Sequence, residues 1–420
     1  MNQTQFVDSL TQLTLGAACG EATTGRKIGN RALLWGAIGG TLPDFDVLAN
    51  FMTDEITAMA FHRGITHSLF FAFTAPFLLA WMTHRFYNSG FYNAPGGKRL
   101  AFWSWTLFFL VVLGGPNLAI VYMTGAVNWT VLLLATGLFA WLVWFFYRKY
   151  YRRSLPPVNA AYRDWVLLWF VSIVTHPLLD SCTAYGTQLF QPFSDYRVAW
   201  NNISVADPLY TLPFLIFLIF VYRAGRLSKQ RRLWNTLAFT LSSAYLCFTV
   251  FNKLNVDRVF ETSLTEQNIP YERYTASPSI LNNLLWQGTA ETAEGYYIGS
   301  YSIMDPTERV LRFNRLDKNH ELLAPYEGQR ELEILQWFTK DYYQVRRVDD
   351  STYRFNDLRY GTRSGGATTD PSDFIFSFEL VDRNGQLEMK GNSRNADGFG
   401  EEWLGRYYRR VMGEVDAFRE

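Results

Sequence analysis

The chain has 420 residues, and its 39 basic and 38 acidic side chains leave a formal net charge of +1. This balance excludes a basic nucleic-acid binder, so no nucleic-acid partner is expected. With 49% hydrophobic and 17% aromatic residues, a disordered chain is also excluded. Residues 1–251 hold only 28 of the 77 charged residues but 11 of the 14 tryptophans. We therefore expect a membrane domain over residues 1–251 and a soluble domain over residues 252–420.

Eight apolar or mixed segments of the first domain predict about eight helices, because roughly 20 helical residues cross a bilayer core. The first two segments mix small and polar residues, which suits helices that face protein rather than lipid. Some of the eight are expected to be short or re-entrant. In chain order the segments are Phe6–Gly20, Arg31–Phe51, Ser68–Met82, Ala101–Met123, Val127–Tyr147, Trp165–Cys182, Pro208–Tyr222 and Leu233–Phe251.

The basic residues of this domain predict its orientation. They form four clusters, which follow the first, third, fifth and seventh segments and hold 16 of the 18 Lys and Arg residues before Asn252. With eight spans all four clusters lie on one side, and the positive-inside rule makes that side cytoplasmic. The N-terminus, the remaining loops and the C-terminal domain are then expected outside the cytoplasm.

Acidic and histidine side chains gather near the outer ends of these predicted helices. Such groups are costly to bury unpaired in a membrane, so each one is a candidate for a functional site. His176 and Asp180 lie four residues apart and share a helix face, so that both can reach one metal ion or, alternatively, tie two helices together. Asp8 and Gln12 have the same spacing. The candidates are Asp8, Asp44, Asp46, His62, His67, His176, Asp180 and Asp207.

Two of the motifs lie where helices begin or end. Pro43 breaks regular helix geometry beside the carboxylates of Asp44 and Asp46, although Asp44 could instead cap a helix and Asp46 could be structural. His62 and His67 cannot share a helix face, because five residues turn them about 140° apart. The glycine between them favours a loop that enters a helix.

Seven motifs occur in the order Asp8-Ser-Leu-Thr-Gln12, Gly16-Ala-Ala-Cys-Gly-Glu21, Gly40-Thr-Leu-Pro-Asp-Phe-Asp46, His62-Arg-Gly-Ile-Thr-His-Ser68, His176-Pro-Leu-Leu-Asp180, Tyr185-Gly-Thr-Gln-Leu-Phe-Gln-Pro-Phe-Ser194 and Asp207-Pro-Leu-Tyr210. Together they resemble the YdjM-type family of bacterial inner-membrane proteins, which is described as metal-dependent hydrolases and has a branch linked to the SOS repressor. The resemblance covers residues 1 to about 250. Many relatives have His where Gln12 stands, and glutamine is a poorer metal ligand.

The resemblance implies a multi-pass protein of the bacterial inner membrane that carries a divalent metal, with zinc favoured by the nitrogen and oxygen ligands. Its pattern is distantly similar to that of zinc-dependent phospholipases C. We therefore expect a hydrolase with its metal site at the outer membrane interface, acting on a phosphoester or lipid-linked substrate. The expected metal ligands are Asp44, Asp46, His62, His67, His176 and Asp180, together with Asp8.

Three further residues are expected to act on the substrate. Arg63 offers a forked guanidinium to the charge of a phosphate, and Tyr185 and Asp207 orient substrate or support the ligands. Peptide or amide hydrolysis stays open, since no motif decides between the two bond types. An ion-coupled transporter is an alternative, but it should spread polar groups through the depth of the bilayer. A membrane scaffold with a closed structural metal site is another.

Residues 252–420 predict a soluble α+β domain, so that the fold class is a multi-span helical membrane domain followed by an α+β domain. The residues 252–264 can extend the last membrane helix, and Asn384-Gly385 is a strong hairpin turn signal. This domain has no recognisable catalytic or nucleotide-binding motif, so we expect it to cap the outer face or to stabilise the protein. The expected strands are Tyr296–Met304, Tyr342–Val348, Tyr353–Tyr360, Phe374–Val381 and Gln386–Lys390, and the expected helices are Arg330–Phe338 and Glu401–Val415.

Overall fold

The computed structural model describes residues 3–365, 370, 373–392 and 401–418, and their side chains except at 3–8, 119–120, 122–124, 391–392 and 401. The chain divides into two compact units. One unit joins Met1–Pro76 to Leu168–Glu420, and the other is Phe77–Leu167. The boundary predicted near Asn252 from composition falls inside a single long helix, α9 (Lys229–Glu266), so the last predicted membrane helix does continue into the C-terminal domain.

The first unit begins with two helices, α1 (Gln3–Ile28) and α2 (Asn30–Thr41), that pack backbone against backbone. A Cβ atom added to Gly16 would lie 2.3 Å from the Gly36 carbonyl oxygen, and one added to Gly40 would lie 2.3 Å from the Gln12 carbonyl oxygen. Because the pairing runs in opposite chain directions, the two helices are antiparallel. Only glycine permits such a close approach, which is typical of helix contacts in membranes.

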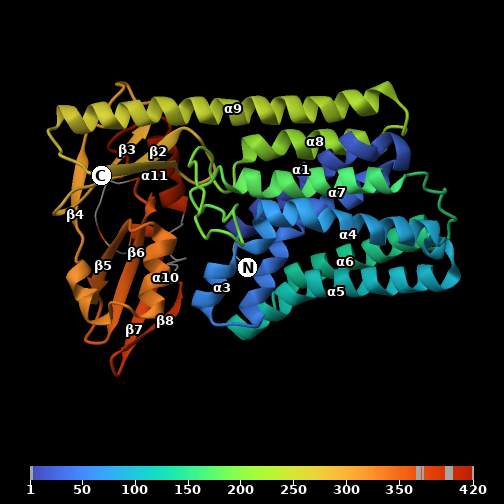
Figure 1. Cartoon of the computed structure of the whole chain (residues 1–420), viewed down its shortest axis with the longest axis horizontal. Coiled ribbons are helices and arrows are strands. Elements are labelled where there is room, and N and C mark those ends of the chain that lie inside the picture. Colours follow the sequence, from blue (N-terminus) through green and yellow to red (C-terminus); the bar gives the residue numbers. More distant parts are fainter. Residues whose placement is uncertain (1–2, 366–369, 371–372, 393–400, 419–420) are drawn as a thin grey trace. The chain divides into compact units, whose positions relative to one another are not determined.

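The predicted segment Arg31–Phe51 is not one helix, because α2 ends at Thr41 and a 3₁₀ helix, η1 (Pro43–Phe51), follows. Pro43 lies at the start of η1, where its missing N–H and fixed φ interrupt the preceding helix. Next come α3 (Glu55–Phe61), the short 3₁₀ helix η2 (Ile65–His67) and α4 (Leu69–Asn88). The unit continues with α7 (Tyr162–Asp180), α8 (Pro208–Arg223) and α9, shown in Figure 1.

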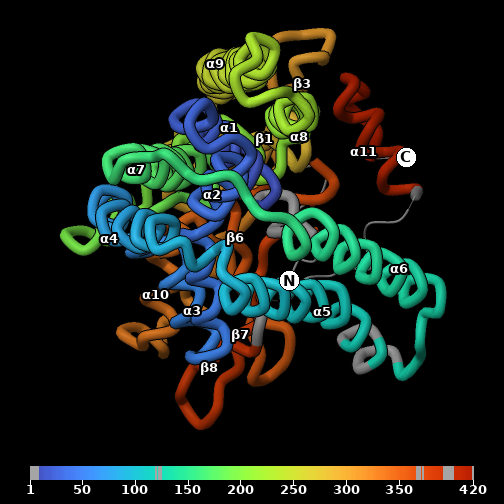
Figure 2. The backbone as a smooth tube through the Cα atoms, turned by 90° about the vertical axis from the view of Figure 1, so that its right-hand side faces the viewer, coloured from blue at the N-terminus to red at the C-terminus, as the bar shows by residue number. Residues whose placement is uncertain are grey.

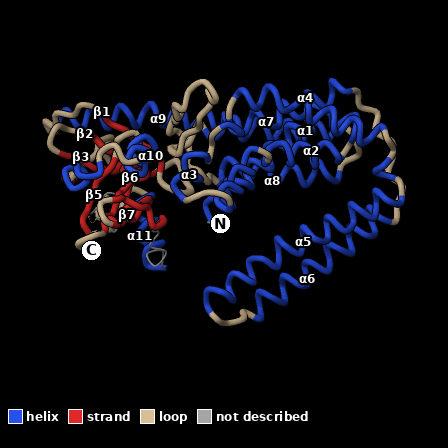
Figure 3. The backbone as a smooth tube through the Cα atoms, turned by 60° about the horizontal axis from the view of Figure 1, so that its bottom comes forward, coloured by secondary structure: helices blue, strands red, loops and turns tan. Residues whose placement is uncertain are grey.

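The second unit is dominated by a helical hairpin of α5 (Pro95–Thr124) and α6 (Trp129–Phe146), which lie side by side in Figure 3. A short π-helical turn, η4 (Tyr147–Tyr151), follows α6, and the unit also contains the end of α4 and the start of α7. The large apolar side chains of this hairpin are mostly exposed, as expected for helices solvated by lipid tails.

Three helices of the described residues are long and apolar enough to cross a membrane: Pro95–Leu118, Trp129–Tyr151 and Lys229–Glu266. A fourth span results if Glu55–His67 and Leu69–Asn88, which meet at an angle of 62°, form one broken span. The helical membrane domain is therefore confirmed in outline. The expectation of eight spans, and the orientation derived from it, stay predictions.

The C-terminal domain contains two four-stranded antiparallel sheets, each with its strands in chain order. The first sheet is β1 (Arg273–Pro278), β2 (Leu285–Glu291), β3 (Gly295–Ser302) and β4 (Phe313–Asp317). The second is β5 (Tyr343–Arg347), β6 (Thr352–Thr362), β7 (Phe374–Arg383) and β8 (Gln386–Asn392). The helices are η5 (His320–Tyr326), α10 (Arg330–Thr339) and α11 (Glu401–Val411).

All five predicted strands are present, and the Asn-Gly turn is confirmed. Asn384 and Gly385 have φ angles of 57° and 84° and join β7 to β8, with Arg383 paired to Gln386. Three strands, β1, β2 and β4, were not predicted. Every residue of β2 is buried, so the strand lacks the alternating pattern that marks a half-exposed strand. The end of α9 covers this sheet through Val256, Val259 and Phe260.

Candidate metal centre

Two histidines and one aspartate from three separate elements bring ligand atoms to one place. The Nε2 atoms of His67 (η2) and His176 (α7) lie 3.0 Å apart, and Oδ1 of Asp44 (η1) lies 3.5 Å and 3.4 Å from them. The ligand atoms of this trio all lie within 4.8 Å of one another. In a tetrahedral zinc site with bonds of about 2.0–2.1 Å, neighbouring ligand atoms are separated by roughly 3.3–3.4 Å. The trio therefore fits one divalent ion.

Asp180 brings a further carboxylate oxygen beside the two histidines, and Asp44, His67, His176 and Asp180 are called the four-donor set below, with Asp180 as its fourth donor. Its Oδ2 atom lies 3.4 Å from Nε2 of His67 and 3.4 Å from Nε2 of His176. This oxygen is buried, and no described residue donates a hydrogen bond to it, although Nε of Arg63 lies 3.2 Å away as an ion-pair partner. Buried carboxylate oxygens without a donor are rare in folded proteins, which makes this atom a natural ligand.

The outer nitrogen of each histidine is held by an acceptor, so that Nε2 faces the site. Nδ1 of His176 is hydrogen-bonded to the Gly40 carbonyl oxygen. Nδ1 of His67 lies 3.2 Å from Oδ2 of Asp46. This arrangement fixes the ring orientation and tautomer, as the outer partners of metal-bound histidines do. The neighbouring Gly39 allows α2 to approach α7 closely, because a Cβ atom added there would lie 2.8 Å from Cβ of Ser172.

His62 and Asp46 form a pair behind His67 rather than part of the four-donor set. Nδ1 of His62 lies 2.8 Å from Oδ1 of Asp46, and the other oxygen of Asp46 accepts the backbone N–H of Arg63 at 2.8 Å. The His62 side chain is 20% exposed. Both residues therefore adjoin the centre, and their role as metal ligands stays a prediction.

The loop that carries both histidines is shaped as the sequence indicates, since α3 ends at Phe61 and α4 begins at Leu69. Within it Arg63 has a φ of 58°, a left-handed conformation that is costly for a residue with a side chain. The turn is held by its N–H bond to Asp46 and by the Arg63 carbonyl, which accepts the N–H of Gln188 at 3.0 Å.

The Arg63 side chain is buried, and its guanidinium contacts Thr183 and Asp180. Its NH1 donates to Oγ1 of Thr183 at 2.9 Å, and its Nε is paired with Asp180. In this structure the guanidinium neutralises the fourth donor. Gln12 also acts on that donor, because its Nε2 donates to Oδ1 of Asp180 at 2.8 Å. The Asp8 side chain, predicted as a ligand, lies outside the described side chains.

Tyr185 and Asp207 lie outside the four-donor set. The Tyr185 ring lies 5.5 Å from the His62 ring and 4.8 Å from the Arg63 guanidinium carbon, and burial raises the pKa of its phenol. Asp207 caps α8 by accepting the Leu209 N–H at 3.0 Å and the Tyr245 hydroxyl at 2.8 Å. Neither of these hydrogen bonds joins Asp207 to the metal centre.

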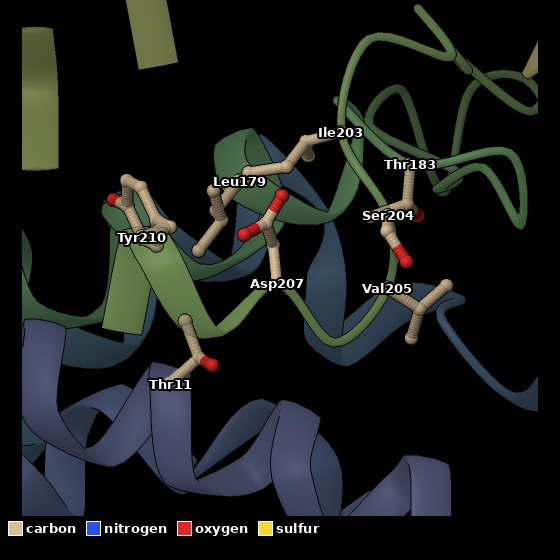
Figure 4. Close-up of a pocket in the computed structure, with 8 residues that line it drawn as sticks. All are labelled: Thr11, Leu179, Thr183, Ile203, Ser204, Val205, Asp207 and Tyr210. Carbon is tan, nitrogen blue, oxygen red and sulfur yellow. The ribbon is translucent and has the colours of Figure 1, made fainter. Parts of the chain in front are cut away.

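A small cavity lies beside Asp207 (Figure 4). The centre of a water molecule can occupy about 10 Å³ of it, so the cavity has room for about one water. Thr11, Thr183, Ser204 and Tyr210 are among its lining residues. The Thr183 hydroxyl also accepts a hydrogen bond from Arg63, which is the ion-pair partner of Asp180. Arg63 therefore connects the lining of the cavity to the metal site. The sequence did not single out Thr183 or Ser204, because lone hydroxyl residues carry no spacing signal.

Comparison with known proteins agrees with the resemblance seen in the motifs. The family model described as "YdjM inner membrane protein" matches residues 7–119 and 130–256, more than half of the chain. The chain belongs to this family. It is also similar to "Uncharacterized protein YfhP" of Bacillus subtilis (strain 168), with 25% identity over 215 residues, 48% of this chain and 60% of that protein. The match thus spans less than two thirds of the relative's length. No solved structure matches the chain.

Proposed function

We propose that this member of the YdjM family is a membrane hydrolase that holds a divalent ion, zinc first, on Asp44, His67, His176 and Asp180. The observation that carries the proposal is the convergence of Asp44, His67 and His176, whose ligand atoms all lie within 4.8 Å of one another, with Oδ2 of Asp180 3.4 Å from Nε2 of each histidine. The orienting contacts on both histidines support it, because a neutral ring that donates from Nδ1 has only a lone pair at Nε2, and two facing lone pairs suit a shared cation.

When bound, the ion would supply Lewis acidity and an acidified water for hydrolysis. The chain's own residues would do the rest. Arg63 compensates the charge of Asp180, and His62, fixed through Nδ1 by Asp46, presents Nε2 as a proton acceptor near the centre. Asp44 and His62 have side chains that are 24% and 20% exposed, so we place the approach of substrate at this edge.

We propose a lipid-linked phosphoester as the substrate class. The 3₁₀ helix that carries Asp44 exposes Phe45, Leu48 and Phe51, and Met52 follows directly after it; Phe51 and Met52 are 85% and 83% exposed. Exposed apolar side chains beside a polar centre suit a substrate with a charged head and an apolar tail. We also propose the multi-pass orientation expected from the basic clusters, with the centre and the C-terminal domain outside the cytoplasm. Labelling of single cysteines placed in the 183–206 loop from the outside tests this orientation.

A structural metal site is the second candidate, and one observation favours it. Asp180 provides a fourth protein ligand, and structural zinc sites are closed by four such ligands, whereas catalytic sites keep one position open. Replacement of Asp180 by Asn separates the two roles. A structural ion contributes to folding, so the protein loses stability together with the ion, whereas a catalytic site loses affinity for the ion without a matching loss of stability.

Metal content of the detergent-purified full chain tests the proposal, measured by plasma mass spectrometry after metal-replete expression. We expect about one zinc per chain in the wild type and none in folded His176→Ala. His84→Ala is the matched control, because His84 is hydrogen-bonded to Asn88 on α4 and belongs to the other compact unit. Absence of metal from the wild type, or its retention in His176→Ala, refutes the site. A bound ion without turnover of any phosphoester lipid favours the structural alternative.

A further inference from the structure

The helix that leads into the metal-site loop is packed by the C-terminal domain. Ile56 of α3 is 3% exposed and belongs to the same buried cluster as Leu332, Leu335 and Phe338 of α10. At the start of α3, Arg330 of α10 donates to the Thr57 hydroxyl. Figures 1 and 2 both show α3 beside α10. Since α3 ends one residue before His62, the position of this histidine depends on a domain more than 250 residues further along the chain.

Tyr185 connects α10 directly to the loop. Its ring centroid lies 5.2 Å from that of Phe338 and 5.5 Å from that of His62. The guanidinium carbon of Arg63 lies 4.8 Å from the same ring. An aromatic ring in such a close-packed position transmits a displacement of one neighbour to the other. Phe338 therefore acts on His62 and Arg63 through one intervening side chain.

Arg197 adds a second connection between the same parts. It is 2% exposed, and its guanidinium donates to the carbonyl oxygens of Tyr185 at 3.3 Å, Gly186 at 3.0 Å and His62 at 3.4 Å. No described carboxylate forms an ion pair with it. The cation is instead surrounded by the rings of Tyr185, Trp337 and Phe338, with its central carbon 4.9, 5.3 and 5.2 Å from their centroids.

Burial lowers the pKa of Arg197 to about 10, which reflects how costly a cation is at this place. Its three carbonyl acceptors and three rings offset that cost only while α10 lies against the loop. The left-handed conformation at Arg63 has the same requirement, because strained backbone persists only where the surroundings impose it. Both features are therefore expected to relax when α10 is displaced.

We propose that the C-terminal domain controls the metal centre. Helix α10, acting through Phe338, Tyr185 and Arg197, holds the His62–Arg63 turn in place. Displacement of α10 then loosens the turn and releases the metal. Phe338, Tyr185 and Arg197 are positioning residues in this scheme. The domain thus regulates the centre, and any partner that moves α10 changes metal occupancy. The proposal rests on the metal site proposed above.

The test compares two substitutions that each remove a phenylalanine ring from the same hydrophobic core. Phe338→Leu removes the ring that touches Tyr185, whereas Phe355→Leu makes a similar change in the same cluster, where Phe355 packs on Tyr343 and Phe378. Arg197→Lys is a further variant that keeps the charge but loses the fork that reaches three carbonyls. Each full-length protein is studied in detergent by hydrogen exchange of the 61–68 peptide without metal, and by zinc affinity measured against a chelator.

We expect Phe338→Leu and Arg197→Lys to speed exchange of the 61–68 peptide and to weaken zinc binding by about tenfold or more, with little effect from Phe355→Leu. Equal effects of the two Phe variants, or unchanged exchange in both Phe338→Leu and Arg197→Lys, overturn the proposal. Faster exchange with unchanged zinc affinity also overturns it. If the wild type binds no zinc, the proposed function fails, and the exchange measurements alone decide whether α10 positions the loop.

Discussion

The glycine contact between α1 and α2 yields the sharpest prediction from this structure. In Gly36→Ala the new Cβ atom would lie 2.2 Å from the Gly16 carbonyl oxygen and 2.9 Å from the Gly20 Cα atom. These neighbours are backbone atoms, which cannot rotate away. An ordinary contact of at least 3.4 Å requires the two helices to separate by about 1 Å, since packed interiors have no spare volume.

The expected loss of stability follows from two opposing terms. Overpacking of this kind costs about 1–3 kcal/mol, whereas replacement of a helical glycine by alanine contributes up to about 1 kcal/mol in favour of folding. Gly114→Ala in α5 is the matched control, because its Cβ atom would have no neighbour within 4 Å. The helix-propensity term is common to both variants, so the difference between them isolates the packing term of about 1–3 kcal/mol.

Reversible unfolding in mixed detergent micelles, followed by tryptophan fluorescence, measures this difference. A value near 2 kcal/mol changes the ratio of folded to unfolded protein about 30-fold. The same substitution should weaken zinc binding, because separation of the helices moves the Gly40 carbonyl away from Nδ1 of His176. Equal stability of Gly36→Ala and Gly114→Ala would refute the close approach of the two helices.

Three further predictions concern charged groups. Glu21→Ala leaves Arg231 buried without its carboxylate and should cost about 3–5 kcal/mol in the same unfolding assay, whereas the double change to Met should recover most of the loss. Asp46→Asn should weaken zinc binding about 10–100-fold by freeing the ring of His67, and an unchanged affinity in a chelator competition would contradict this orienting role. The pKa of Lys340 is lowered by burial and by two neighbouring arginines to about 8, below the value near 10.4 of an unfolded chain. The folded state then binds fewer protons between these values, so wild-type stability should rise with pH from about 8 to 10 relative to Lys340→Met, and parallel pH profiles of the two proteins would count against it.

Much of the local structure could be predicted from the sequence. The hairpin at Asn384-Gly385 follows from two residues that tolerate positive φ. The break at Pro43 and the loop between His62 and His67 follow from helix geometry. By contrast, β2 gave no signal, because a strand buried on both faces has no alternation.

The candidate site was predictable as a set of residues but not as an arrangement. Spacing alone put His176 and Asp180 on one helix face, and the structure does bring both beside Nε2 of His67. The spacing could not distinguish the four-donor set from Asp46 and His62. Asp46 contacts the outer nitrogen of His67, and His62 contacts Asp46. That distinction depends on where three distant elements meet, and no local pattern encodes it.

Composition and spacing by themselves determined that this protein has an apolar helical part, a polar C-terminal part and a cluster of histidines and aspartates suited to a metal. These properties depend on hydrophobicity and on the helical repeat, which act over short stretches of chain. Only the tertiary structure decided that the Gly40 carbonyl meets Nδ1 of His176, that Asp180 lies beside Nε2 of His67, and that α3 packs against α10. Such contacts join residues more than 100 positions apart, and their geometry results from packing of whole helices, to which each residue contributes only a small part.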